Sequence, residues 1–392
     1  MKAFDPTAAA TASLGRRLTE LPAIQARFVE RRAGLRRNDR IAHQQQIAGG
    51  LVRLTVAPAL PEQIRDIGLF RPNEVHTGVG RISNGLGCPH IETDPDFLGI
   101  MLAFRTGDRR VDFLGINHPT SPTDTIDEFV ALLAATAEAA GVKISFGDIG
   151  RLELGNLAAA QLKMFNVLRK RLGFARATRI YAHVAKQTSR TLLSSSAYQP
   201  YWTGISNLAG TLGKFTLVPH DDVNRRRRIS PGPRHLTIDW RQRNTQGDLG
   251  FRLFWIPYLS ELETPIDRLT KKWAEAHRIE VGSVTFARTD AGTREAKLFA
   301  VLASEMGANP GNWIGDRDRN SKNLDGPATE FEAGRSLAYR KSQSGRSALP
   351  ESLYASVFES GEIAPDLATE LVRRYRSNRE TEHGGPDLGV IA

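Results

Sequence analysis

The placement of β-prone segments restricts the fold of this 392-residue chain more than any other feature. These segments are rich in Val, Ile, Leu and Phe and are separated by turn residues, which is typical of antiparallel strands. They occupy 51–57, 79–85, 98–106, 110–117, 214–219, 234–240, 250–259 and 278–288. Because no helix alternates regularly with them, the pattern disfavours a parallel doubly wound sheet and favours an antiparallel barrel or large sheet.

Helical periodicity occupies most of the remaining chain. Residues 124–141 and 156–173 carry apolar side chains at helical spacing, and the sequence TDTID offers an N-cap for the first of them. An amphipathic helix or arm is expected over 14–37, and helical character returns after Asp325. Strands and helices that are segregated rather than alternating predict an α+β fold.

Composition argues against several classes of protein. The single cysteine, Cys88, can form no intrachain disulfide, and residues 1–15 lack the apolar core of a secretory signal, so a cytoplasmic protein is expected. No apolar run reaches the roughly 18 residues of a membrane span. The formal charge is +10, but the arginine run 225–228 has no interleaved aromatic side chains. We therefore expect a solvated loop there and no nucleic-acid partner.

Familiar catalytic motifs are missing from the sequence. It contains no GxGxxG between a strand and a helix, no GxxxxGK[ST], no HExxH and no paired-cysteine metal motif. The nine histidines are scattered, so no histidine metal centre is predicted. Dinucleotide and zinc chemistry therefore have no support in the sequence.

The segment GRSLAYRKSQSGR, residues 334–346, carries the main functional signal. Arg335 and Tyr339 are four residues apart, which places them on one face of a helix, one turn from each other. A free tyrosine titrates near pH ~10, and a nearby cation or a metal is needed to make it a phenolate at neutral pH. Phenolate is a strong anionic donor that favours ferric iron. Taken alone, such a pair is more often a surface stacking contact, so its neighbours decide the interpretation.

This segment resembles the proximal-helix motif of the catalase superfamily. In that motif an Arg, three further residues and the haem-ligating Tyr are followed, seven residues after the Tyr, by an Arg that binds a haem propionate. Arg335, Tyr339 and Arg346 stand at these positions. Three matched positions in one short segment are more specific than the Arg–Tyr pair alone.

The N-terminal half carries the other matches, in the family's order. Arg40 stands three residues before His43, as an Arg precedes the distal His of the family. Arg81 and Ser83 lie in a segment similar to the family's Arg-Phe-Ser, and Asn117 shortly precedes a proline. His76 also superficially resembles the distal His, but it lies only five residues before Arg81, which is too close for the barrel topology.

The resemblance implies a catalase-like, eight-stranded antiparallel β-barrel with surrounding helices, and haem b (iron protoporphyrin IX) between the barrel and a proximal helix. It implies that Tyr339 binds the iron and that Arg335 stabilises its phenolate. On the opposite face of the haem, His43 would move the proton of a hydroperoxide and Asn117 would donate a hydrogen bond to it. The other residues implied to hold the haem are Arg40, Arg81, Ser83, Phe129 and Arg346. For Phe129, packing in the core is at least as well supported.

The resemblance also divides the chain. It implies an N-terminal helical arm over 1–38, a haem-binding core over 39–348 and a C-terminal helical tail over 349–392. The expected partner is a peroxide or hydroperoxide of low molecular mass, and assembly into a homo-oligomer stays open.

Departures from the family pattern leave the activity open. Where the family has an aromatic pair after the Asn-Pro segment, residues 120–123 read Thr-Ser-Pro-Thr, which predicts a wider and more polar pocket. Three functions remain. The chain is a catalase or peroxidase acting on hydrogen peroxide, an enzyme that reduces or rearranges organic hydroperoxides as the allene oxide synthases of this fold rearrange those of fatty acids, or a haem-binding protein without turnover.

Overall fold

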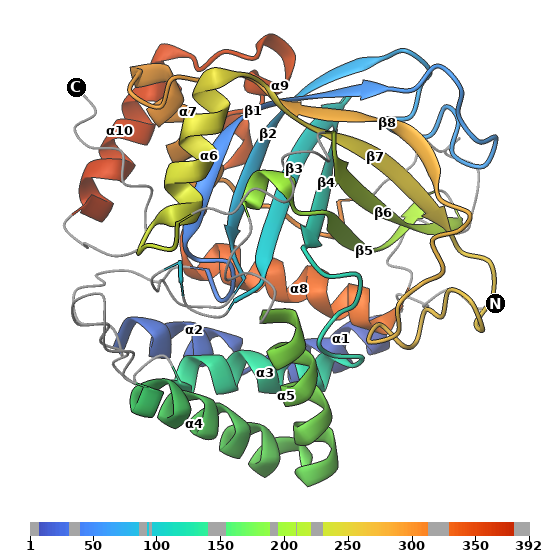
Figure 1. Ribbon diagram of the computed structural model, residues 1–392, viewed down its shortest axis with the longest axis vertical. Helices are drawn as coiled ribbons and strands as arrows, with labels where there is room; N and C mark the ends of the chain where they lie inside the picture. Colours follow the sequence, from blue (N-terminus) through green and yellow to red (C-terminus); the bar gives the residue numbers. More distant parts are fainter. Residues whose placement is uncertain are drawn as a thin grey trace.

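Eight strands form a closed barrel in the computed structural model (Figure 1). The structure describes residues 8–30, 40–85, 92–93, 96–139, 154–188, 195–208, 210–220, 230–312 and 329–379. Each strand pairs antiparallel with the next along the chain, and β8 closes the barrel against β1. The strands are β1 (Gln46–Val56), β2 (Val75–Asn84), β3 (Leu98–Thr106), β4 (Arg109–Ile116), β5 (Tyr201–Leu208), β6 (Thr211–Pro219), β7 (Leu249–Pro257) and β8 (Ile279–Phe286). The prediction of an α+β fold with an eight-stranded antiparallel barrel is confirmed.

One predicted strand is wrong. Residues 234–240 lie in helix α6 (His235–Gln246), although Leu236, Ile238 and Trp240 alternate as strand residues do. In the helix, Leu236 and Trp240 are four residues apart and only 1% and 4% exposed, while Ile238 is 52% exposed. The carboxylate of Glu92 accepts hydrogen bonds from the Leu236 and Thr237 N–H groups, at 2.6 and 3.0 Å. This distant cap satisfies donors at the helix start and has no signature in the local sequence.

The place of the wrongly predicted strand in the barrel is taken by β5, which the alternation of apolar residues did not predict. Its Tyr201 and Leu208 face the packed interior, while the register shifts between Trp202 and Ile205. A bulge of this kind breaks the alternation of buried and exposed side chains. The alternation of apolar and polar residues is therefore lost in β5, the strand that follows the long helical segment.

The interior of the barrel is filled. Aromatic side chains meet there, with the Phe113 and Phe215 rings 5.2 Å apart and the Phe70 and Phe215 rings stacked at 5.4 Å. An eight-stranded barrel is just wide enough for side chains to fill it. The space for a large ligand must therefore lie outside the barrel.

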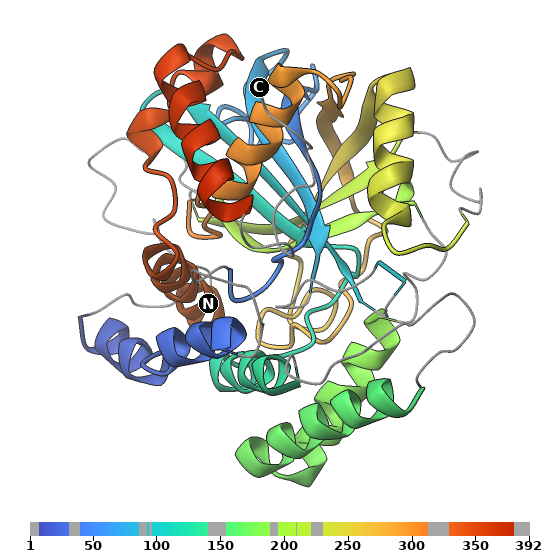
Figure 2. The same cartoon turned by 90° about the vertical axis from the view of Figure 1, so that its left-hand side faces the viewer.

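Helices cover the outside in two groups (Figures 1 and 2). Beneath one end lie α1 (Ala8–Arg17), α2 (Leu21–Glu30), α3 (Ile126–Ala139) and α8 (Glu330–Gly345), which share one apolar cluster. The paired helices α4 (Leu154–Leu172) and α5 (Phe174–Thr188) pack against α3. On the other side, α7 (Arg294–Glu305), α9 (Val357–Ser360) and α10 (Pro365–Arg379) pack against β2 and β3. Short 3-10 turns occupy Ser196–Tyr198 and Glu351–Leu353.

Several sequence predictions lie outside the described residues. They include Cys88 and the arginine run 225–228. Within the described part of the chain, no helix is long and apolar enough to cross a membrane.

Candidate functional site

A cavity lies between the outer face of the barrel and helices α3 and α8. The volume of the cavity is about 200 Å³. On the same measure, a single bound water needs roughly 10–15 Å³. Most of its wall is apolar, but it gathers five cationic side chains and one carboxylate among the described residues. These are Arg40, Arg81, Lys214, Arg335, Arg346 and Glu332. Such a concentration of buried positive charge is costly unless anions enter the cavity.

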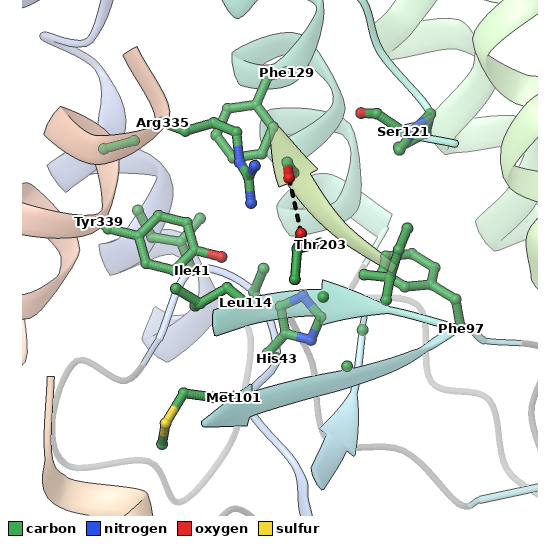
Figure 3. Close-up of a pocket in the computed structure, with 18 of the residues that line it drawn as sticks. Ile41, His43, Phe97, Met101, Leu114, Ser121, Phe129, Thr203, Arg335 and Tyr339 are labelled. Carbon is green, nitrogen blue, oxygen red and sulfur yellow. Dashed lines mark hydrogen bonds between the residues drawn. The ribbon is translucent and has the colours of Figure 1, made fainter. Parts of the chain in front are cut away.

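Helix α8 supplies one wall of the cavity. It begins at the N-cap Thr329, whose side chain accepts a hydrogen bond from the Glu332 N–H at 3.2 Å. Arg335 and Tyr339 lie on the cavity face, as their spacing predicted, with the guanidinium carbon 6.0 Å from the centre of the tyrosine ring. Figure 3 shows the Tyr339 ring and the Arg335 side chain directed into the same space.

Arg335 is held by a carboxylate and fits against a glycine of the barrel. Its Nη1 donates to both oxygens of Glu332, at 3.0 and 3.2 Å. Both side chains lie against Gly204 of β5, where any Cβ would overlap them. A larger residue at Gly204 would therefore displace the guanidinium from Tyr339.

His43 enters the cavity from the barrel side. Its backbone has a positive φ of 58°, and its N–H donates to the Gly85 carbonyl at 3.1 Å. This conformation lays the imidazole against Gly99 of β3, where a Cβ would overlap the ring. Burial and the nearby Arg81 and Arg40 lower the pKa of His43 to about 3, so the imidazole is neutral at physiological pH.

The partners of His43 determine which ring nitrogen carries the proton. Nδ1 lies 3.1 Å from the carbonyl oxygen of Asn84, which can only accept a hydrogen bond. Nδ1 must therefore be protonated, with the Ser83 hydroxyl also near it at 3.3 Å. The lone pair is left on Nε2, which makes Nε2 a proton acceptor.

Two of the three arginines expected at the haem propionates, Arg40 and Arg346, converge at the C-terminal end of α7. Arg40 Nη2 donates to the carbonyls of Ser304 and Met306, both at 2.9 Å. Arg346 donates to the carbonyls of Glu305 and Met306, at 3.2 and 2.8 Å. The last carbonyls of a helix favour cations, so α7 positions both guanidinium groups.

Arg81 is oriented by a residue that the sequence did not single out. Its Nη2 donates to the carbonyls of His43 and Gln44, at 2.7 and 3.0 Å, and its Nε donates to Gln46 Oε1 at 3.1 Å. The Gln46 amide in turn donates to the Ala300 carbonyl on α7 at 2.9 Å. Because this link joins residues far apart in the chain, no local motif reveals it.

The structure does not bring Asn117 to the cavity. Its Oδ1 accepts from the Leu98 N–H at 2.8 Å, which extends the pairing of β3 with β4. The flanking Ile116 and His118 are the residues that line the cavity. His118 Nδ1 accepts from the Thr120 N–H at 3.3 Å, so His118 is a second buried histidine at this wall.

The remaining expected residues divide between the cavity and the core. Ser83 lines the cavity beside His43, and Phe129 lines it while packing edge-to-face on Phe331, with ring centres 6.1 Å apart. Phe129 therefore faces the cavity and also packs in the core, which are the two roles that the sequence left open. His76 Nε2 lies 2.9 Å from the Leu69 carbonyl and is not one of the residues that line the cavity.

Lys214 of β6 is a cavity residue that the sequence interpretation missed. Its side chain lines the cavity although the residue is only 4% exposed. Burial lowers the pKa of Lys214 to about 8. A signal did exist, because Lys214 begins the apolar β-prone segment 214–219, where a lysine is unexpected.

The residues present fit a haem group. The cavity combines apolar walls, a phenol oxygen on α8, a neutral imidazole on the barrel side and arginines for two carboxylates. Gly99 leaves room for the imidazole. Among the described residues, no group of three or more His, Cys, Asp or Glu side chains could hold a metal ion. An iron in this cavity would therefore depend on its porphyrin and on a single protein ligand.

Comparison with solved structures shows that the chain has the catalase fold. It is similar to a fungal catalase, with 12% identity and a TM-score of 0.59, and to a bacterial catalase, with 16% and 0.54. It is also similar to catalase A from Saccharomyces cerevisiae, with 11% identity and a TM-score of 0.59. Each alignment covers 79% of this chain. The chain aligns with 60%, 57% and 61%, respectively, of the length of these catalases. No protein-family model and no curated protein matches the sequence.

Proposed function

We propose that the chain is a haem-dependent oxidoreductase that consumes hydrogen peroxide or organic hydroperoxides. The observation that carries the proposal is the joint placement of Tyr339 and His43. They extend from α8 and from the barrel side into one cavity of a catalase fold, which Arg40, Arg81 and Arg346 also line. The cavity therefore has a ligand for ferric iron, a proton acceptor and counter-charges for two carboxylates.

The chain's own residues would hold the haem as follows. Tyr339 would bind the iron through its phenolate, which the Arg335 guanidinium stabilises. Arg40, Arg81 and Arg346 would pair with the propionates, which neutralises charges that are costly when buried alone. When bound, ferric haem supplies the centre at which the O–O bond of a peroxide is cleaved.

His43 performs the proton transfer in this proposal. Nε2 would accept the proton of a hydroperoxide held in the cavity and return it to the oxygen that departs when the O–O bond is cleaved, so that the leaving group would be water or an alcohol. The Asn84 carbonyl fixes Nδ1 as the protonated nitrogen, and Gly99 leaves the room that the ring occupies. We assign no catalytic step to Asn117, because its amide oxygen is bonded to the backbone of β3.

Organic hydroperoxides are the second candidate substrate class. Thr120, Ser121 and Pro122 line the cavity where the related pattern has an aromatic pair, so small side chains leave it wide. A bulky hydroperoxide regains its positioning through its own apolar contacts, which a small peroxide cannot. A haem-binding protein without turnover is less well supported, because a neutral and oriented His43 serves no purpose in simple haem retention.

An optical spectrum of the purified chain tests the proposal. We expect the bands of a ferric haem with a tyrosinate ligand, and Tyr339→Phe should lose haem or change its spin-state bands. The matched control is Tyr258→Phe, since Tyr258 donates to Glu261 at the surface. If Tyr339→Phe keeps an unaltered spectrum at full occupancy, the ligand assignment is wrong.

A further inference from the structure

Lys214 is a buried ammonium group at the edge of the cavity. It lies on the outer face of β6, because the next residue, Phe215, packs in the barrel interior. Backbone pairing places it between Ile205 of β5 and Ile256 of β7, neither of which carries a charge. The side chain is therefore enclosed by the sheet beneath it and by α8 and the 258–278 segment above it.

The contacts of this ammonium group are unusual. Within the described part of the chain, Nζ makes no hydrogen bond and no ion pair, and its nearest partner is the ring of Trp273, whose centre is 4.7 Å away. The Trp273 Nε1 donates to the Pro265 carbonyl at 2.8 Å, so the ring is held in place. An ammonium group has three donors, and leaving them unpaired in the interior is costly.

The neighbouring charges do not complete this site. Glu332 acts on Lys214 from α8, but both of its carboxylate oxygens accept from Arg335. Burial lowers the pKa of Lys214 to about 8, and the positive charge of Arg335 acts in the same direction. An anion that enters the cavity would supply the missing acceptor and favour the charged form of the lysine.

The arginines that would hold the propionates lie at the opposite end of α8. Glu332, beside Lys214, precedes Arg346 by fourteen residues, which corresponds to about 20 Å along a helix. Tyr339 stands midway between them. The two propionates of haem b project from one edge of the ring, and Arg40 and Arg346 share the Met306 carbonyl at the Arg346 end. Lys214 is therefore not needed for the propionates and is available to a second anionic ligand.

Apolar side chains line the cavity near Lys214. Phe129, Trp202, Leu269 and Phe331 share an apolar cluster with Trp273, whose ring contacts the lysine. A ligand that used the lysine as its counter-charge would lie with an uncharged body against these side chains. The other cation that acts on Lys214, Arg335, already pairs with Glu332. An ammonium group without such a partner beside apolar walls is typical of a site for an amphipathic monoanion.

We propose that Lys214 binds the carboxylate of a monocarboxylic acid whose apolar body lies along the cavity towards Tyr339 and His43. Resting on the function proposed above, this site makes carboxylate-bearing organic hydroperoxides the preferred substrate class. The binding site itself depends only on Lys214 and the apolar wall. It therefore admits a test that does not use turnover.

Calorimetric titration of the full-length chain with octanoate, with and without bound haem, tests this site. We expect Lys214→Met to weaken octanoate binding by about ten-fold or more, the usual worth of a hydrogen bond to a charged group. Lys214→Arg keeps the charge and should stay within about three-fold of the wild type. Octan-1-ol, which lacks the carboxylate, should bind the wild type and Lys214→Met equally. The matched control is Lys272→Met, since Lys272 is exposed and pairs with Glu275 at 3.4 Å.

The outcomes separate the site from the proposed function. Equal octanoate affinity for the wild type and Lys214→Met would overturn the site, as would a wild type that does not bind octanoate. A chain that binds octanoate through Lys214 but no haem would keep the site and refute the proposed function. A purely structural lysine predicts that Lys214→Met lowers the melting temperature, whereas we expect it to be unchanged or raised, because an unpaired buried charge is removed. If Lys214→Met fails to fold, the structural interpretation holds and the proposal falls.

Discussion

The interior of the barrel and the cavity outside it use opposite chemistry within one fold. Inside, Phe113 packs edge-to-face on Phe215 and Phe251 packs on Phe286, and Phe113, Phe215 and Phe251 have no exposed surface. Outside, beneath the same strands, the cavity collects cations such as Arg81 and Lys214. Side chains alternate along each strand, so one sequence serves both environments. The barrel interior packs apolar side chains and its outer face carries the charges of the cavity, which predicts that substitutions in the two regions affect stability and the proposed binding separately.

His43→Ala should have the largest effect, and only on the cavity side of the comparison. Loss of the Nε2 acceptor is expected to slow peroxide consumption by about 10²–10⁴-fold, the usual worth of general acid–base catalysis. Haem content and melting temperature should stay close to those of the wild type. Initial rates at equal haem content provide the measurement.

The control for His43 is His76→Ala. His76 lies near the Leu69 carbonyl and outside the cavity lining, so we expect its removal to leave turnover within about two-fold. Reversed phenotypes would transfer the proton-transfer role to His76 and invalidate the assignment of the N-terminal half.

Phe215→Ala should have a comparable effect on the other side of the comparison. Removing a fully buried aromatic side chain from the barrel interior is expected to lower the free energy of unfolding by about 3–5 kcal/mol. Urea denaturation measures this change, and haem binding per folded molecule should persist. The control Phe174→Ala truncates a residue that is 68% exposed, with an expected change within about 0.5 kcal/mol. Similar losses in both variants would contradict the assignment of stability to the barrel interior.

Thr120→Phe should narrow the cavity and leave the barrel interior unchanged. We expect the wild type to consume cumene hydroperoxide as fast as hydrogen peroxide or faster. The added ring should shift this ratio towards hydrogen peroxide by about one order of magnitude, through lost space for the larger substrate. Thr178→Phe, on the exposed face of α5, is the control. Vigorous oxygen release by the wild type, with no reaction of the organic hydroperoxide, would contradict the wide-pocket interpretation.

The pH dependence of His43 gives the smallest expected change in turnover. Its pKa in the folded chain is about 3, against 6.5 in a free side chain. Turnover that depends on the neutral imidazole should therefore stay constant as the pH falls below 6.5 and decline only as it approaches 3. Between these values the unfolded chain binds the additional proton, so stability falls as the pH falls through the same window.

His43→Leu provides the control for this pH dependence. It removes the titrating group, so its stability should fall less steeply below pH 6.5 than that of the wild type. Melting temperatures of both proteins across the window measure the difference. Identical slopes would show that the imidazole is not held neutral in the folded chain.

The sequence alone was sufficient for the class of fold and for one wall of the cavity. Alternating apolar segments predict strands because a strand exposes its two faces in turn, and the lack of regular alternation with helices favours an antiparallel barrel or large sheet. The spacing of Arg335 and Tyr339 predicts a shared helix face, since four residues make about one turn. Both inferences use relations between residues that are close in the chain.

Tertiary structure decided everything that depends on contacts between distant residues. Glu92 caps the segment 234–240 as a helix, although its alternation suggests a strand. The hydrogen bond from the Leu98 N–H to Oδ1 holds the Asn117 side chain away from the cavity. Trp273 and α8 close over Lys214 and turn an ordinary lysine into a buried cation. Burial and hydrogen-bond pairing depend on which segments meet when the barrel closes, and local periodicity contains no information about that meeting.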